Sequence, residues 1–201
     1  EVRCETDFVA RSDTFQAFLQ AFASGVMAEK VKDPAGFSEV KIDGKPAEDA
    51  RHSAVLKLGE NIQLCRGESM AASGVFYGYS HGNKIGVVVV LKGGTVDLAK
   101  DIAMHVAASN PEFLLPSEVS AEAIEREKAV FVSLNEDKIK GKPAEIVEKM
   151  VAGRIQKFLA EASLVEQAFV KDPEIKVGAL AKKAGAEIVS FTYFKVGEGI
   201  E

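Results

Sequence analysis

The side chains most able to carry out chemistry are scattered along the chain and lack the spacing of a reaction centre. His105 stands between Met104 and Val106, which is typical of a histidine on a helix face, and His81 lies in a tight turn. We find no metal-ligand spacing and no nucleophile signature among the cysteines and histidines, which are Cys4, Cys65, His52, His81 and His105. The sequence therefore predicts no metal, no cofactor and no catalytic residue.

The run Lys92-Gly93-Gly94-Thr95 is a candidate anion site, because it lies between an expected strand and an expected helix. It lacks the spacing of the Gly-x-x-x-x-Gly-Lys-Ser/Thr phosphate loop and of the dinucleotide-binding fingerprint. A plain turn is the favoured interpretation. The alternative is a small α+β enzyme that holds an anionic substrate at this turn.

A different kind of functional residue stands at the junction of the first expected strand and helix. Phe8 follows Asp7 and precedes the polar residues 11–13. Residues 1–5 alternate as in a half-buried strand, and Asp13 is the expected N-cap of the helix. Phe8 must either pack into its own core or project toward a partner protein. Regular structure at both ends of the loop would present the ring stiffly.

The elements that would position these residues follow from hydrophobic periodicity and turn residues. We expect helices at 13–32, 47–58, 96–109, 120–135, 143–162 and 177–184. We expect strands at 1–5, 61–65, 74–80, 85–91 and 188–196. The helices at 120–135 and 143–162 are amphipathic and are joined by a turn at 138–142, so they predict an antiparallel, coiled-coil-like hairpin that projects from the body.

The order of elements predicts an α+β fold with two related core subdomains, the second interrupted by the helical hairpin. Residues 58–62 (LGENI) and 184–188 (AGAEI) precede a strand in each half, which supports a repeat, although coincidence is the alternative. The predicted parts are an N-terminal core subdomain at 1–82, a C-terminal core subdomain at 83–118 and 170–201, and the inserted hairpin at 119–169.

Composition limits the classes of partner. The chain has 201 residues, 30 acidic and 25 basic side chains and a net charge of -5, which argues against broad contact with nucleic acid. No apolar run is long enough to span a bilayer, so we expect no membrane. Two cysteines are too few for a disulfide framework, which favours a reducing cytoplasm. Because the chain opens on Glu1 in mid-strand, we expect a fragment or processed form.

Taken together, the motifs resemble the elongation factor Ts family, the nucleotide exchange factors of the translational GTPase elongation factor Tu. The matching motifs occur in the family's order and cover nearly the whole chain, at residues 4–10 (CETDFVA), 57–62 (KLGENI), 79–82 (YSHG), 103–111 (AMHVAASNP), 141–154, 167–170 and 196–200. The full-length hairpin resembles the bacterial form. The resemblance implies that the chain begins after the family's small N-terminal helical domain.

The resemblance implies a protein that is not an enzyme but binds elongation factor Tu and promotes GDP release. The loop from Thr6 to Val9 would enter the GTPase near its bound magnesium, with Phe8 wedged between two helices and Asp7 engaging the same region. Lys171 departs from the apolar residue that the family often has. The implied partner-binding residues are Thr6, Asp7, Phe8, Val9, Leu58, Gly59, His81, Val170 and Lys171. Core packing is the alternative for Leu58 and Val170.

A third interpretation is a scaffold in which the hairpin at 120–162 pairs between copies of the chain. Its amphipathic helices have apolar faces that could meet in a homodimer. Some members of the resembled family dimerise, so a homodimer through the hairpin is a possible assembly.

Overall fold

The computed structural model describes residues 1–31, 33–70 and 73–198. Its contacts divide the chain into two compact units. Of the described residues, the N-terminal unit contains 1–31, 33–70, 82–85 and 194–198, and the C-terminal unit contains 73–81 and 86–193. Helices and several small sheets occur in the chain, which confirms the predicted α+β class.

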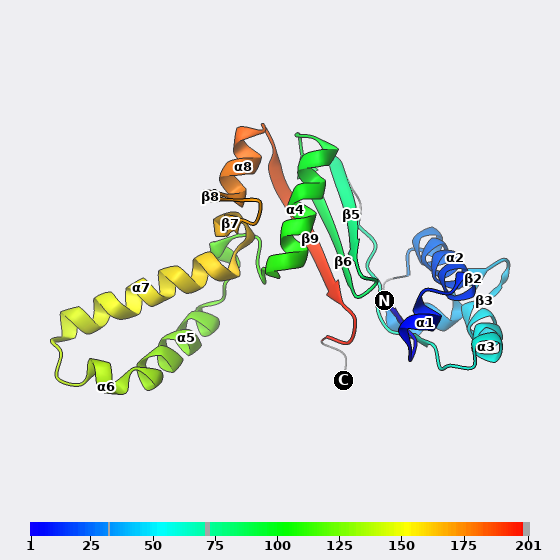
Figure 1. Cartoon of the computed structure of the whole chain (residues 1–201), viewed down its shortest axis with the longest axis horizontal. Helices are drawn as coiled ribbons and strands as arrows, with labels where there is room; N and C mark the ends of the chain where they lie inside the picture. The colour runs from blue at the N-terminus through cyan, green and yellow to red at the C-terminus, as the bar shows by residue number, and fades with distance from the viewer. Residues whose placement is uncertain (32, 71–72, 199–201) are drawn as a thin grey trace. The chain divides into compact units, whose positions relative to one another are not determined.

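The N-terminal unit combines helices with two short antiparallel ribbons (Figure 1). Strand β1 pairs with β4, and β2 pairs with β3. The first ribbon is shorter than the strands expected at 1–5 and 61–65. The elements are β1 (Val2–Arg3), α1 (Asp7–Ala10), α2 (Asp13–Glu29), η1 (Pro34–Glu39), β2 (Lys41–Ile42), β3 (Lys45–Pro46), α3 (Ala47–Leu58) and β4 (Gln63–Leu64).

Helix α2 supplies three of the four phenylalanines in the core of this unit. Its buried side chains recur at helical spacing, as the sequence predicts, and are Phe15, Phe18, Phe22 and Val26. The cap differs from the expected one, because the Ser12 hydroxyl accepts a hydrogen bond from the Phe15 N–H at 3.3 Å. Asp13 is instead the first helical residue, where its negative charge interacts favourably with the positive end of the helix dipole.

The core of the N-terminal unit has two neighbouring parts, both formed on α2. One part contains Val9, Phe15, Phe18, Ala54 and Ile62. The other contains Phe22, Val26, Phe37, Val40 and Ala47. The rings of Phe22 and Phe37 meet edge to face with their centroids 5.5 Å apart. Burial of these side chains holds α2 against α3, and that packing fixes the segments before and after each helix.

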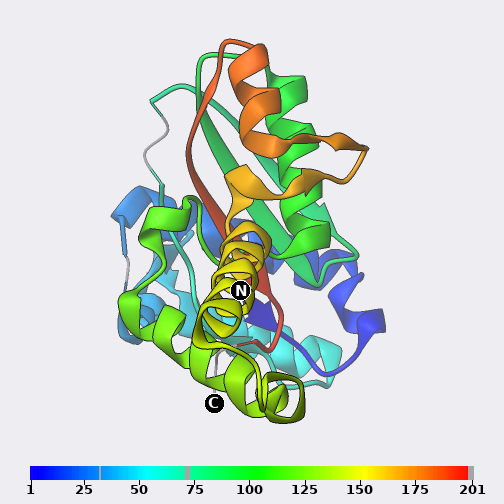
Figure 2. The same ribbon diagram turned by 90° about the vertical axis from the view of Figure 1, so that its left-hand side faces the viewer.

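The C-terminal unit is built on a three-stranded sheet of order β5-β6-β9, with α4 packed against β5. The central strand β6 is buried at Val87 and from Val89 to Leu91, within the β-branched run that predicts a central strand. Figure 2 shows α8 in front of α4, and in Figure 1 β9 is drawn between the two helices. The elements are β5 (Val75–His81), β6 (Ile85–Lys92), α4 (Val96–Ser109), η2 (Pro116–Glu118), α5 (Ala121–Leu134), α6 (Glu136–Ile139), α7 (Ala144–Ala162), η3 (Leu164–Glu166), β7 (Ala168–Phe169), β8 (Asp172–Lys176), α8 (Val177–Lys183) and β9 (Glu187–Lys195).

Helices α5 and α7 form the predicted hairpin and lie side by side (Figure 1). Arg154 of α7 bonds through Nε to the Glu127 carboxylate of α5 at 2.6 Å, which ties the two helices together. The connection differs from the turn expected at 138–142, because the short helix α6 at 136–139 occupies its first two residues. Pro143 immediately precedes α7 rather than occupying its first turn.

Domain organisation is more interleaved than the sequence suggests. Strand β5, which the predicted boundary at residue 82 assigns to the N-terminal subdomain, is hydrogen-bonded to β6 in the C-terminal unit. Residues 194–198, assigned to the C-terminal subdomain, group with the N-terminal unit. The predicted repeat relationship between two subdomains stays a prediction. Among the helices of the described residues, none combines the length and apolar character needed to cross a bilayer.

Candidate partner-binding site

The loop that carries Phe8 is a single helical turn, α1, and not the irregular connection that the sequence suggests. Thr6 is its N-cap, with extended backbone angles (φ −122°, ψ 154°) and a hydroxyl oxygen that accepts the Val9 N–H at 3.3 Å. Short polar residues at the junction favour this cap. The Phe8 side chain is 89% exposed. The ring therefore lies outside the core of its own chain, where it is available to a partner protein.

Val9 plays the opposite part to Phe8. The family resemblance groups it with the binding residues, but its side chain is buried and packs with Phe15 and Phe18 of α2. Ser12 adds a second attachment, since its hydroxyl donates to the Val9 carbonyl oxygen at 2.8 Å. Val9 thus anchors α1 to the body, and this anchor holds the neighbouring Phe8 ring outward.

A carboxylate that sequence reasoning missed holds the start of this turn. One oxygen of Glu60 accepts the backbone N–H groups of Glu5 at 3.1 Å and of Thr6 at 2.9 Å. The other oxygen accepts the hydroxyl of Thr6. The hydrogen bond from the Thr6 hydroxyl, helped by the two backbone donors, holds the pKa of the Glu60 carboxyl below its usual range. Glu60 is therefore a charged acceptor at neutral pH.

The end of α3 places Glu60 beside the loop. Gly59 ends the helix in the left-handed conformation (φ 72°), and its N–H donates to the Val55 carbonyl at 2.8 Å. Leu58, just before it, is half-buried and packs on the core that contains Val9, whereas Gly59 is exposed. Two of the predicted contact regions, the loop at Thr6 and the helix end at Gly59, are thus joined through one side chain.

Asp7 is the charged member of the loop. Its carboxylate lies 3.5 Å from the Lys84 ammonium, and both side chains are mostly exposed. An ion pair in this setting contributes little to the free energy of folding, because water and salt screen it. Asp7 can therefore exchange Lys84 for a donor on a partner at small cost.

His81 is the last residue of β5 and is exposed, as expected for a residue at a turn. Its ring nitrogen Nδ1 lies 3.1 Å from the hydroxyl of Tyr79. The two residues that follow, Gly82 and Asn83, both have positive φ, which glycine and asparagine tolerate best. The turn therefore leaves the His81 ring at the surface, oriented by Tyr79.

Val170 and Lys171 form the turn between β7 and β8, and both are exposed. Helix α4 holds this turn at two points. The Val170 N–H donates to Nδ1 of His105 at 3.1 Å, and the Lys171 ammonium lies 2.7 Å from the Asp101 carboxylate. The apolar side chain of Val170 is 50% exposed, so its core packing is at most partial.

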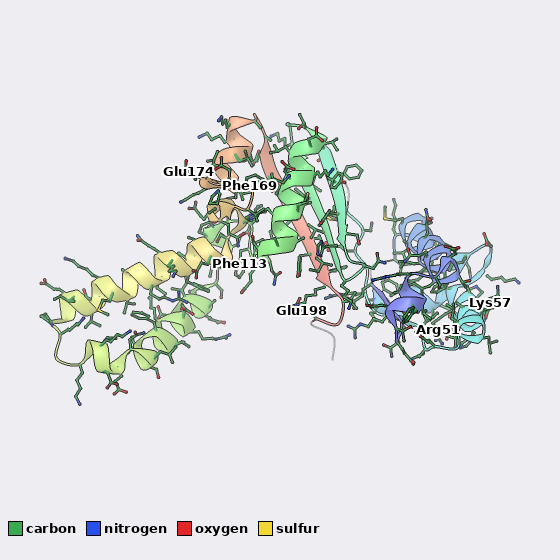
Figure 3. The ribbon with its side chains drawn as sticks, in the orientation of Figure 1. Arg51, Lys57, Phe113, Phe169, Glu174 and Glu198 are labelled. Atoms are coloured by element: carbon green, nitrogen blue, oxygen red, sulfur yellow. The ribbon has the colours of Figure 1, made fainter. Side chains whose placement is uncertain are left out.

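His105 is the buried polar residue beneath that turn, as its place on a helix face predicts. Because Nδ1 accepts a backbone N–H, the proton is on Nε2, which donates to the Gln167 side-chain oxygen at 2.8 Å. Burial lowers the pKa of His105, which favours this neutral form. Phe169, labelled in Figure 3, lies beside α4 with its ring centroid 5.9 Å from that of His105. The histidine is structural.

The alternative anion site at residues 92–95 is a packed turn. The Thr95 hydroxyl already accepts the Leu98 N–H at 3.2 Å as the cap of α4. A Cβ atom at Gly93 would lie 2.6 Å from the Gly185 carbonyl oxygen, so the glycine serves close packing of two turns. Within the described residues, no cluster of three or more His, Cys, Asp or Glu side chains is placed to hold a metal ion.

Comparisons with known proteins agree with the motifs. A family model described as "Elongation factor TS" matches residues 5–198. Elongation factor Ts of Pseudomonas syringae pv. tomato (strain ATCC BAA-871 / DC3000) is 68% identical over 201 residues, covering 100% of this chain and 68% of the relative. Elongation factor Ts of Pseudomonas putida (strain GB-1) is 60% identical with the same coverage.

Proposed function

The chain belongs to the elongation factor Ts family, the nucleotide exchange factors of the translational GTPase elongation factor Tu, and we propose that the Phe8 ring drives its exchange activity. The observation that carries this proposal is the 89% exposure of Phe8 on a turn whose next residue is buried. The protein would act in the cytoplasm and, in this proposal, needs no active site, metal or cofactor of its own.

The proposed mechanism is mechanical. The Phe8 ring enters the nucleotide domain of elongation factor Tu near the bound magnesium and wedges between two of its helices, while Asp7 engages the same region. A rigid apolar ring costs little to desolvate and can hold a packed gap open. Packed elements switch between discrete arrangements, so a small wedge can withdraw ligands from magnesium and the phosphates.

The remaining contacts would orient the factor on its partner. Gly59 and the half-buried Leu58 would meet the GTPase beside the Phe8 loop, and His81, Val170 and Lys171 would supply contacts from the C-terminal unit. The Lys171 ammonium is paired with the Asp101 carboxylate, so this side of the β7–β8 turn is charged. Val170 therefore provides the apolar part of that contact.

Thermodynamic linkage fixes how exchange ends. If the factor weakens GDP binding by some ratio, GDP weakens binding of the factor by the same ratio. GTP and GDP both displace the factor from the complex, so the direction of exchange follows from the nucleotide concentrations and not from the factor.

The assay for this function is release of a fluorescent GDP analogue from elongation factor Tu, followed by stopped flow against a chase of unlabelled GDP. We expect the release rate to rise with the concentration of the chain until it saturates. Adding excess GDP should dissociate the complex, as reciprocity requires. A release rate that does not change with concentration of the chain would refute exchange activity.

A further inference from the structure

Three donors from the start of the Phe8 loop converge on one side chain of another element. The Glu60 carboxylate follows the end of α3 and accepts the N–H groups of Glu5 and Thr6 and the hydroxyl of Thr6. These partners are separated from it by 54 and 55 positions in sequence. We propose that Glu60 is a positioning residue that fixes the turn presenting Phe8, an inference that rests on the proposed exchange function.

The turn needs such a support because it is very short. Helix α1 has 4 residues, far fewer than an isolated helix requires in water. Its own hydrogen bonds run from the Ala10 N–H to the Thr6 carbonyl at 3.1 Å and from Arg11 to Asp7 at 3.3 Å. Attachments to the body must therefore supply the order that the helix itself lacks.

Val9 and Glu60 supply that order at opposite ends of the turn. Val9 is buried near its C-terminal end, while Glu60 grips the Thr6 cap at its N-terminal end. The Thr6 hydroxyl works in both directions, because it donates to Glu60 and accepts the Val9 N–H. Phe8 lies between the two attachments, so both are needed to set the direction of its ring.

A second side chain links the same two segments in the opposite direction, from residue 5 to residue 61. The Glu5 side-chain oxygen accepts the N–H of Asn61 at 3.3 Å. Glu5 thus binds the residue after Glu60, while Glu60 binds the N–H of Glu5. Hydrogen bonds to a charged acceptor are stronger than neutral ones, and Glu60 has three such bonds.

Positioning has a predictable kinetic signature. A loop that is already ordered loses less entropy on docking. A variant with a less ordered Phe8 loop should therefore bind elongation factor Tu more weakly. For Glu60→Gln we expect the concentration giving half-maximal GDP release to rise about tenfold, with the saturating rate within about twofold of the wild type. Amide hydrogen exchange in residues 6–10 should quicken by about tenfold, and exchange in α2 should be unchanged.

Glu48→Gln is the matched control. It removes the same charge from the first turn of α3, where Glu48 pairs with Arg51, and should leave both readouts at wild-type values. Thr6→Val removes the hydroxyl that links the Glu60 carboxylate to the turn, and it should reproduce the Glu60→Gln defect. The double variant should be no worse than the worse single variant, because both act through the same contacts.

Unchanged half-maximal concentration and unchanged amide exchange in Glu60→Gln would overturn the proposal. A higher half-maximal concentration with normal amide exchange would also overturn it, since Glu60 would then contact the partner directly. The proposed function fails separately if Phe8→Ala leaves GDP release unaffected. In that case amide exchange of residues 6–10 still decides whether Glu60 orders the turn.

Discussion

Phe8→Ala is expected to lower the acceleration of GDP release by about 30-fold or more, which is the effect of losing a binding hot spot of roughly 2 kcal/mol. Folding should be almost unaffected, because the side chain is 89% exposed and makes few contacts to lose. We expect the free energy of unfolding to change by less than about 0.5 kcal/mol, as for other surface substitutions. Stopped-flow GDP release and thermal denaturation, measured on one preparation, check both statements.

Phe76→Ala provides the control for Phe8→Ala. Phe76 is a second exposed phenylalanine, on β5 of the C-terminal unit, with 57% of its surface accessible. Its truncation should leave the release rate within about twofold of the wild type, as expected outside a hot spot. An intact release rate in Phe8→Ala would show that the ring does not drive exchange.

Phe15→Ala is expected to have the opposite outcome, although it lies only seven positions further along the chain. Phe15 is buried in the core formed with Val9 and Phe18, so the truncation removes packing and leaves a cavity. We expect a loss of about 3–5 kcal/mol in unfolding free energy. The fall in melting temperature should be on the order of 10 °C by calorimetry.

The GDP-release assay separates this core effect from a loss of contact with the partner. At a temperature where Phe15→Ala is still folded, it should keep more exchange activity than Phe8→Ala, because its exposed ring is intact. Phe15→Leu should recover most of the stability, since leucine fills most of the space. A melting temperature equal to that of the wild type would contradict the core assignment of Phe15.

Much of the fold could be predicted because it is encoded locally. The spacing of Phe15, Phe18 and Phe22 is enough to define the buried face of α2, and the amphipathic pattern of residues 120–162 is enough to define the hairpin. Gly59 likewise predicts the end of α3, because a left-handed residue there favours glycine.

The details that escaped prediction depend on competition or on distant contacts. Ser12 and Asp13 are both good caps, so their residue types alone do not decide between them, and in the structure Ser12 takes the role. Phe8 and Val9 are adjacent apolar residues, but Phe8 is exposed and Val9 is buried. The helical turn that separates them in this way has only four residues, which is too short for hydrophobic periodicity to reveal.

The candidate site shows the same limit. The sequence identifies Phe8 as a residue that must either be buried or bind, but it cannot choose between them without the fold. Glu60 lies within the motif at residues 57–62, but the motif does not identify its partners, because Glu5 and Thr6 are more than fifty residues away. A carboxylate directly after the glycine that ends a helix is a pattern worth examining, but its role depends on which loop lies opposite.

The most direct test of the account is photo-crosslinking from position 8, with Phe8 replaced by a benzophenone analogue of phenylalanine. In complexes with nucleotide-free elongation factor Tu, we predict covalent links in the nucleotide domain, on the helices beside the magnesium site. The same analogue at Phe76 should not give these links. Links confined to other domains of the GTPase, in a variant that still releases GDP, would contradict the wedge.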